Sequence, residues 1–161
     1  MKRRPKRRRW CGAFGRSCVR RNQQVGEAMY LFVYGTLLSD QPNHRLLRPF
    51  IDPEQTLAAV LPGAVLHDAG AYPMVVRGVG RVLGEVVWVR PECADEALAQ
   101  LDAYEDVADG LYTRETATVI TPCCGPIVDA WVYWGNPHIA ARYPRIPSGD
   151  WRAHVRRKRF S

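Results

Sequence analysis

The chain has 161 residues, of which 47% are apolar and 24% are charged. This is the size and composition of one ordinary soluble domain that can bury a sizeable core. No apolar stretch approaches the ~20 residues that a membrane-spanning helix requires, so we expect no membrane partner.

The net charge of +7 is distributed unevenly along the chain. Residues 1–28 hold ten of the 23 Lys and Arg residues but only one acid, Glu27. The other 133 residues hold 13 basic and 15 acidic residues, a net charge of −2. Because the positive charge is concentrated in this arm and in the tail at 156–159, the folded part gains little support as a nucleic-acid-binding surface.

Residues 1–28, the basic arm, show no sustained apolar periodicity, and repulsion among their positive charges favours disorder. No apolar segment follows these charges, which excludes a secretory signal. Three interpretations stay open: sequence read in frame upstream of a natural start at Met29, an organelle-targeting peptide, or a tether to nucleic acid or an anionic surface. We therefore expect a basic disordered arm at 1–28, a domain at 29–155 and a basic tail at 156–161.

The cysteines and histidines show none of the spacings typical of metal sites. The five cysteines are an odd set without paired CxxC geometry: Cys11, Cys18, Cys93, Cys123 and Cys124. The histidines are scattered: His44, His67, His138 and His154. We therefore predict reduced thiols in a cytoplasmic protein, no metal site and no Ser/His/Asp triad.

Short β-branched and aromatic runs predict strands. They lie at 30–34, 81–89, 116–121 and 127–134, with a fifth at 58–66 that is broken at Pro62-Gly63 and a short sixth at 72–76. Residues 91–105 carry apolar side chains at helical spacing, with Pro91 suited to the first turn, and predict a helix. Six strands with few helices indicate a mostly closed sheet or barrel with helical decoration.

The first predicted strand ends in Tyr34-Gly35-Thr36-Leu37. A glycine at a strand end lets the backbone take an unusual turn and lets a ligand approach the backbone N–H groups, which suits a carboxylate or a carbonyl oxygen. A simple turn without function is the alternative interpretation.

Glu105 stands at the end of the predicted helix, close in sequence to Asp102, Asp106 and Asp109. The negative end of the helix dipole and the neighbouring carboxylates would both raise the pKa of Glu105. A carboxylate with a raised pKa suits a proton shuttle that works near neutral pH. A solvated acidic helix end is the alternative interpretation.

Residues 110–114 lead into a strand in which alternation places Tyr112 and Arg114 on the same face. A phenol and a guanidinium that face a cavity could position a carboxylated substrate, although a surface pair explains the pattern equally well. Gly70-Ala71-Tyr72-Pro73 is typical of a turn into a short strand, where the tyrosine serves packing.

Six motifs follow one another along the chain: Val33-Tyr34-Gly35-Thr36-Leu37, Gln41-Pro42-Asn43-His44, Gly70-Ala71-Tyr72-Pro73, Gly84-Glu85-Val86, Leu101-Asp102-Ala103-Tyr104-Glu105 and Tyr112-Thr113-Arg114. In this order they resemble the gamma-glutamylcyclotransferase superfamily, and most of all its gamma-glutamylamine cyclotransferase-like branch. The ending at 146–151 is similar to that of bacterial members whose substrates are often unassigned. The resemblance covers Met29 to about Val155 and leaves the basic arm outside.

The resemblance implies an α+β fold, a small mixed β-barrel flanked by a few helices, with a ligand cavity at the turn after the first strand. The substrate-holding loop of the family maps onto Tyr34–Leu37, its catalytic acid maps onto Glu105, and Tyr112 matches a side chain that lines the same pocket. Family members release a γ-glutamyl group as 5-oxoproline without a metal or an organic cofactor. The expected partner is therefore a small γ-glutamyl compound.

The residues make physical sense of that reaction. The α-amine attacks the γ-carbonyl of its own molecule, so the protein has mainly to fold the substrate into the geometry of a five-membered ring. Backbone N–H groups at 35–37 could hold the glutamyl carboxylate or the developing oxyanion. Glu105 would carry a proton from the α-ammonium to the departing amine.

Two alternatives from other classes stay open: a non-catalytic module that binds γ-glutamyl or oxoproline-like ligands, and an interaction protein that engages nucleic acid through its basic arm. The leaving group of the substrate depends on loops at 41–54 and 103–110, where the sequence carries no readable code. The oligomeric state is equally open.

Overall fold

A computed structural model describes residues 29–160, without the side chain of Val128. The expectations for the basic arm at 1–28 lie outside the described residues. Within residues 29–160 the chain forms six strands, three α-helices and two 3-10 helices. The strands are β1 (Met29–Val33), β2 (Ile51–Asp68), β3 (Pro73–Val89), β4 (Tyr112–Thr121), β5 (Gly125–Gly135) and β6 (Arg145–Ile146). The helices are η1 (Pro42–Leu46), η2 (Pro91–Cys93), α1 (Ala94–Tyr104), α2 (Pro137–Ala140) and α3 (Trp151–Arg159).

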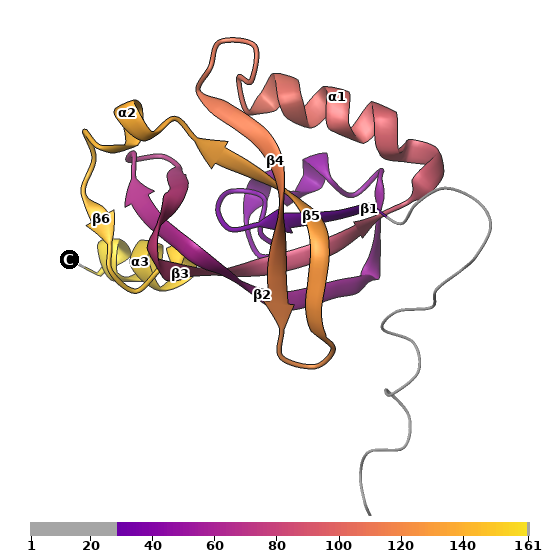
Figure 1. Cartoon of the computed structure of the whole chain (residues 1–161), viewed down its shortest axis with the longest axis horizontal. Coiled ribbons are helices and arrows are strands. Elements are labelled where there is room, and N and C mark those ends of the chain that lie inside the picture. The colour runs from indigo at the N-terminus through magenta and orange to yellow at the C-terminus, as the bar shows by residue number, and fades with distance from the viewer. Residues whose placement is uncertain (1–28, 161) are drawn as a thin grey trace, which may run out of the picture.

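Five of the strands close into a barrel. They pair in the order β3-β1-β5-β4-β2, and β2 pairs again with β3, which leaves only the short β6 at an edge of β2 (Figure 1). The β1–β5 pair is parallel and the other pairs are antiparallel, so the sheet is mixed. The expectation of an α+β fold with a small mixed β-barrel and a few helices is confirmed.

The central strand β1 is buried almost along its whole length, with Leu31, Phe32 and Val33 at most 3% exposed. Such a run of apolar residues is typical of a strand that is covered on both faces. The helix α1 contributes Ala97 and Leu101 to the same core. The turn after β1 meets the end of α1, because Oγ1 of Thr36 lies 3.0 Å from the hydroxyl of Tyr104, so the two motifs of interest are next to each other.

The helix predicted at 91–105 is confirmed, with two refinements. Pro91 begins a short 3-10 turn, η2, before the α-helix starts at Ala94. The helix ends at Tyr104, and Glu105 is its C-cap residue, whose N–H donates to the carbonyl of Leu101 at 2.9 Å.

Two predicted strand breaks do not occur. The strand β2 continues through Pro62 because a bulge at Gly63, with φ of 67°, absorbs the irregularity. The runs predicted separately at 72–76 and 81–89 form one strand, β3. Gly80 lies inside this strand. A Cβ there would come within 2.9 Å of the carbonyl oxygen of Ala64, so the glycine permits close pairing of β3 with β2 and does not end the strand.

The helix α3 was not predicted. Asp150 caps it, with its carboxylate accepting a hydrogen bond from the N–H of Ala153 at 3.1 Å, and Trp151 anchors it with 4% exposure. Its last turn carries the basic residues 156–159, which suits the negative end of a helix dipole. Among residues 29–160, no helix is both long enough and apolar enough to cross a membrane.

Candidate functional site

A cavity of about 260 Å³ opens at the end of β1. It is lined by residues from the end of β1, the turn that follows it, the β2–β3 turn, the end of α1, and the ends of β4 and β5. The structure brings all six sequence-predicted site residues together in its wall: Tyr34, Gly35, Thr36, Leu37, Glu105 and Tyr112. Their catalytic and binding roles stay predictions.

The turn after β1 is shaped by close packing at Gly35. The N–H of Leu38 donates to the carbonyl of Gly35 at 3.1 Å, which closes the turn. A Cβ on Gly35 would lie 2.5 Å from Cγ of Pro73, so no larger residue fits. The expectation of an unusual backbone turn is wrong, because Gly35 does not have a positive φ; the glycine is required by the approach of Pro73.

The backbone N–H groups of Gly35, Thr36 and Leu37 belong to residues that line the cavity. Within residues 29–160 they donate to no backbone or side-chain group of the protein. Successive free N–H groups in a turn form a concave donor surface that suits an anion or a developing oxyanion.

Glu105 forms the acidic part of the wall. Because α1 ends at Tyr104 and Asp106 has a φ of 49°, the chain reverses here and the half-buried carboxyl of Glu105 lines the cavity. Burial, and then the nearby charge of Asp106, raise the pKa of Glu105 to about 7. The predicted direction of the shift is therefore found, but burial is its main cause.

Asp102 does not share in that effect, contrary to expectation. Its carboxylate pairs with Nε of Arg114 at 3.0 Å and accepts a hydrogen bond from the hydroxyl of Tyr133 at 2.8 Å. The guanidinium of Arg114 also lies over the ring of Trp131, 4.8 Å from its centroid. Arg114 is consequently held outside the cavity lining, and the predicted pair with Tyr112 facing the cavity does not form.

Two buried tyrosines hold the cavity walls in place. The hydroxyl of Tyr34 donates to the carbonyl of Tyr133 at 2.7 Å, and that of Tyr112 donates to the carbonyl of Pro73 at 2.9 Å. Burial raises the pKa of both phenols, and the charge of Glu105 raises both further. Both groups therefore stay neutral. Tyr34 joins the segment after β1 to β5, and Tyr112 joins β4 to the start of β3.

A second set of contacts, which the sequence does not predict, joins Thr36, Asn43 and Tyr104. The hydroxyl of Tyr104 lies 3.0 Å from Oγ1 of Thr36 and accepts a hydrogen bond from Nδ2 of Asn43 at 2.8 Å. All three residues belong to the ordered motifs, but nothing local indicates that they meet, because Asn43 and Tyr104 are 61 residues apart. The contacts tie the turn after β1 to the end of α1.

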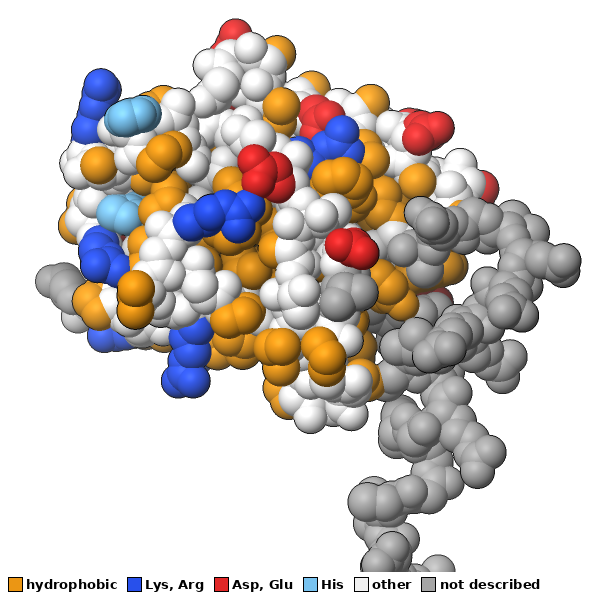
Figure 2. All heavy atoms as spheres, in the orientation of Figure 1, with side chains coloured by type: hydrophobic (Ala, Val, Ile, Leu, Met, Phe, Trp, Pro, Cys, Tyr) orange, Lys and Arg blue, Asp and Glu red, His pale blue; other side chains and the backbone are white. Residues whose placement is uncertain are grey.

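The charges around the cavity are acidic. Glu105 and Asp106 are the only ionisable residues besides tyrosines among those that line it. On the face shown in Figure 2, acidic side chains gather over the α1 side and basic ones over the side of β6 and α3. An anionic group of a ligand would therefore have to be held by backbone N–H groups rather than by a basic side chain.

None of the four histidines in residues 29–160 lines the cavity, and the side chains of His44, His67 and His154 have structural partners. Nδ1 of His44 is 2.8 Å from the carbonyl of Leu37, and Nε2 of His154 is 2.7 Å from the carboxylate of Asp68. No cluster of three or more His, Cys, Asp or Glu residues that could hold a metal occurs between residues 29 and 160.

A small mixed barrel with a cavity at the end of its first strand, lined by the turn at residues 34–37 and by two acids, Glu105 and Asp106, defines the class of the protein. Residues 31–153 match the family described as gamma-glutamyl cyclotransferase, AIG2-like. The chain belongs to this family.

Individual relatives agree with this assignment. A Vibrio cholerae protein named "Putative gamma-glutamylcyclotransferase" is 37% identical over 124 residues, which cover 75% of this chain and 93% of that protein. The crystal structure of an AIG2-like protein from Mus musculus is 26% identical, with a TM-score of 0.52 over 75% of this chain and 87% of that one. YkqA from Bacillus subtilis is 28% identical, with a TM-score of 0.65 over 84% of this chain. The match spans only 44% of YkqA.

Proposed function

We propose that this protein is a gamma-glutamylcyclotransferase that releases 5-oxoproline from a small γ-glutamyl compound. The observation that carries the proposal is the placement of Glu105, whose pKa is raised to about 7, in the same cavity as the free N–H groups of residues 35–37. Membership of the family and the similarity to the Vibrio cholerae protein support the same activity.

The proposed reaction begins with proton removal. The ionised carboxyl of Glu105 takes a proton from the α-ammonium of the substrate, which frees the nitrogen lone pair. That nitrogen attacks the γ-carbonyl carbon of the same molecule and gives a tetrahedral oxyanion. The N–H groups of the turn at Gly35–Leu37 stabilise either this oxyanion or the α-carboxylate.

The reaction ends with transfer of the proton to the leaving group. As the bond between the γ-carbon and the leaving nitrogen breaks, Glu105 returns its proton to that nitrogen. The ring nitrogen loses its second proton to the departing amine, so the products are 5-oxoproline, whose ring amide is neutral and whose α-carboxylate stays ionised, and an ammonium ion. A pKa near 7 suits Glu105 to both steps, because the carboxyl is partly ionised at neutral pH and still protonates readily.

The cavity lining contains no basic side chain that could bind the substrate carboxylate. The shape of the cavity therefore has to orient the substrate. The walls of Tyr34 and Tyr112 are fixed by hydrogen bonds and do not need to rearrange. A rigid wall favours the folded conformation of a glutamyl chain, in which the reacting groups are already near each other.

The test is a panel of γ-glutamyl compounds incubated with the full chain and followed by mass spectrometry for 5-oxoproline. The panel contains γ-glutamyl amino acids and γ-glutamyl-ε-lysine, with α-glutamyl dipeptides as negative controls. Release from at least one γ-glutamyl compound supports the proposal. Binding of these compounds by calorimetry without any release would instead favour the non-catalytic module.

We also propose that the protein works in the cytoplasm. Cys93 and Cys123 are unbridged in the described part of the chain, as is usual in a reducing compartment. Fractionation of the source cells with an antibody against the protein tests this proposal, and recovery in an extracellular fraction would contradict it.

A further inference from the structure

The proposed mechanism does not use Glu85, although this glutamate is 8% exposed and belongs to one of the ordered motifs. Glu85 lies on β3, paired with Val33 at the end of β1. Its neighbour Gly84 allows this pairing, because a Cβ there would lie 2.2 Å from the carbonyl oxygen of Val33. The Gly84-Glu85 motif therefore lies directly beneath the point where β1 leads into the cavity turn.

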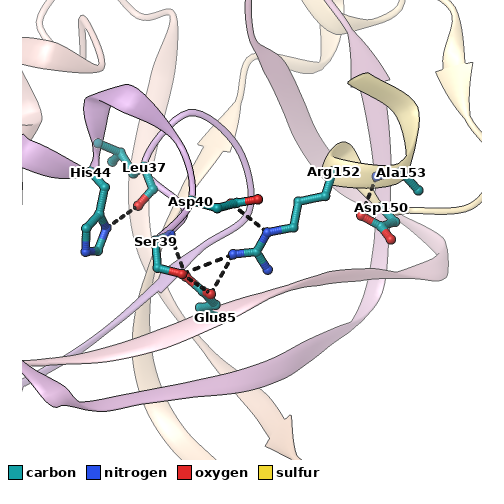
Figure 3. Close-up of polar contacts among 8 residues, drawn as sticks. All are labelled: Leu37, Ser39, Asp40, His44, Glu85, Asp150, Arg152 and Ala153. Carbon is teal, nitrogen blue, oxygen red and sulfur yellow. Dashed lines mark hydrogen bonds and ion pairs between the residues drawn. The ribbon is translucent and has the colours of Figure 1, made fainter. Parts of the chain in front are cut away.

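The carboxylate of Glu85 accepts three hydrogen bonds. The N–H of Ser39 donates to Oε2 at 2.8 Å, the hydroxyl of Ser39 donates to Oε1 at 2.6 Å, and Nη2 of Arg152 donates to Oε1 at 2.6 Å (Figure 3). Burial disfavours the charged form of Glu85, yet these bonds lower its pKa below the ordinary value. A buried carboxylate with this many donors is a fixed, ionised anchor.

Arg152 completes the arrangement from the other side. Its Nε donates to Oδ1 of Asp40 at 2.7 Å and its Nη2 lies 3.2 Å from Oγ of Ser39, so one guanidinium holds two consecutive loop residues and Glu85 together (Figure 3). Arg152 sits on the first turn of α3, which Asp150 caps. We call Ser39, Asp40, Glu85 and Arg152 the Glu85 clamp.

The helix that carries Arg152 is itself fastened to the barrel. Asp68, at the end of β2, is 2.7 Å from Nε2 of His154 and 2.5 Å from Nζ of Lys158. Trp151, the first residue of α3, is 4% exposed and belongs to the hydrophobic core. Arg152 is therefore presented to the loop from a fixed position.

The clamp acts close to the amides that the proposed reaction needs. Ser39 directly follows the turn at residues 35–38, which is closed by the hydrogen bond from the N–H of Leu38 to the carbonyl of Gly35. A shift of Ser39 would move the N–H groups of residues 35–37 relative to Glu105, which stands on a different element. Small displacements of this kind are costly in enzymes, because the reacting geometry tolerates little error.

We infer that Glu85 and Arg152 are positioning residues that fix the turn at residues 35–38 in the geometry that binds the substrate. The inference rests on the proposed function. It gives the Gly84-Glu85 motif and the helix α3 a role in substrate binding, although neither lines the cavity.

The first experiment does not depend on activity. Hydrogen exchange is compared by mass spectrometry between the unaltered chain, Glu85→Gln and Arg152→Lys, with attention to peptides that cover residues 34–41. Glu85→Gln keeps the shape but removes the charge, and Arg152→Lys keeps the charge but removes the forked donor geometry. We expect exchange in residues 34–41 to rise about tenfold in both variants, while peptides of β4 and β5 stay unchanged.

Steady-state kinetics provide the second measurement. In both variants we expect KM for the γ-glutamyl substrate to rise by roughly tenfold or more, with a smaller change in kcat, because the amides are displaced whereas Glu105 is untouched. The double variant should be no worse than the worse single variant, since the two residues act as one unit.

Glu115→Gln is the matched control. Glu115 pairs with Arg77 at 2.6 Å, as Glu85 pairs with Arg152, but on the exposed surface. It should change neither exchange at residues 34–41 nor KM.

The outcomes separate the two proposals. Unchanged exchange and unchanged KM in Glu85→Gln and Arg152→Lys would overturn the positioning role and leave the cyclotransferase proposal standing. Suppose that exchange at residues 34–41 rises in the variants, but that the unaltered chain releases no 5-oxoproline from any compound. This result would refute the proposed function, and with it the role of the clamp in substrate binding. A third outcome combines a rise in exchange across the whole chain in Glu85→Gln with no change in local exchange or KM in Arg152→Lys. This outcome would show that the clamp is a purely structural contact and would overturn the positioning role.

Discussion

Two carboxylates near the cavity differ in a way that burial alone does not explain. Burial disfavours the charged form of both carboxyls, so burial by itself would predict a raised pKa for Glu85 as well as for Glu105. The opposite is found for Glu85, because its pKa lies below its ordinary value, whereas that of Glu105 is raised to about 7.

Hydrogen-bond donors account for the difference. The carboxylate of Glu85 accepts two hydrogen bonds from Ser39 and one from Arg152, and these lower its pKa. The pKa of Glu105 is raised by burial and, second, by the negative charge of Asp106. The same residue type thus becomes a permanent anion in one place and a titrating group in the other. The comparison teaches that the supply of donors, rather than depth, separates a structural carboxylate from one suited to proton transfer.

The largest expected effect follows from removing the titrating group. Glu105→Gln keeps the shape of the side chain but cannot accept a proton, so kcat for 5-oxoproline release should fall by about 10²–10⁴. KM should change little, because the backbone amides remain. Steady-state assays with Glu115→Gln as the control measure both constants, and a Glu105→Gln enzyme with ordinary turnover would refute the assignment.

The pH dependence of the rate gives a second check on Glu105. Because the ionised form accepts the proton, kcat/KM should rise with pH through about 7, where Glu105 loses its proton. A rate that is flat between pH 5 and 9, about two units either side of the expected value, would contradict the assignment.

The two carboxylates should affect stability with opposite signs. The folded state holds a proton on Glu105 up to about pH 7, whereas the unfolded state releases it near the ordinary value of 4.5, so folding loses stability as the pH rises through that window. Glu105→Gln should therefore be more stable than the unaltered chain at pH 8, by about 1–3 kcal/mol, with the gap closing towards pH 5.

Glu85→Gln should behave in the reverse way. The lowered pKa of Glu85 contributes stability that is present above 4.5 and is lost as the pH falls through its folded value. The variant should be less stable by about 1–3 kcal/mol at pH 7 and lose this difference in acid. Urea denaturation across the pH range measures both variants, and slopes of the same sign would break the comparison.

An effect of similar size on stability is expected from Gly35→Ala. The added Cβ would meet Cγ of Pro73 at 2.5 Å, so the turn must shift at a cost of about 1–3 kcal/mol, and KM should rise. Gly63→Ala is the control, because it strains a positive φ in the β2 bulge but lies outside the cavity lining. An unchanged KM in Gly35→Ala would show that the turn tolerates movement.

The smallest effect is expected on the exposed surface. The side chains of Arg77 and Glu115 are 62% and 51% exposed, so their ion pair is screened by water despite a separation of 2.6 Å. Glu115→Gln should cost at most about 1 kcal/mol and leave turnover unaltered. A larger decrease in the free energy of unfolding, measured by urea denaturation, would show that this exposed ion pair stabilises the fold although it is not buried.

Local patterns explain what could be predicted. The strand at β1, the helix α1 and the position of Glu105 at its end follow from runs of neighbouring residues, and all three are found. The helix α3 was missed because Trp151 is its only buried residue, so no apolar period marks it. The breaks expected at Pro62-Gly63 and between 76 and 81 were wrong, because a bulge and close strand pairing accommodate those residues.

The sequence by itself determined the class of fold, the family and the identity of the candidate acid, because these depend on short motifs and their order. Only the tertiary structure decided which acid titrates and which is anchored. Ser39 and Arg152 lie 46 and 67 residues from Glu85 along the chain, and Pro73 lies far from Gly35. Electrostatic and steric effects depend on distance in space, which the folded barrel sets and residue spacing does not.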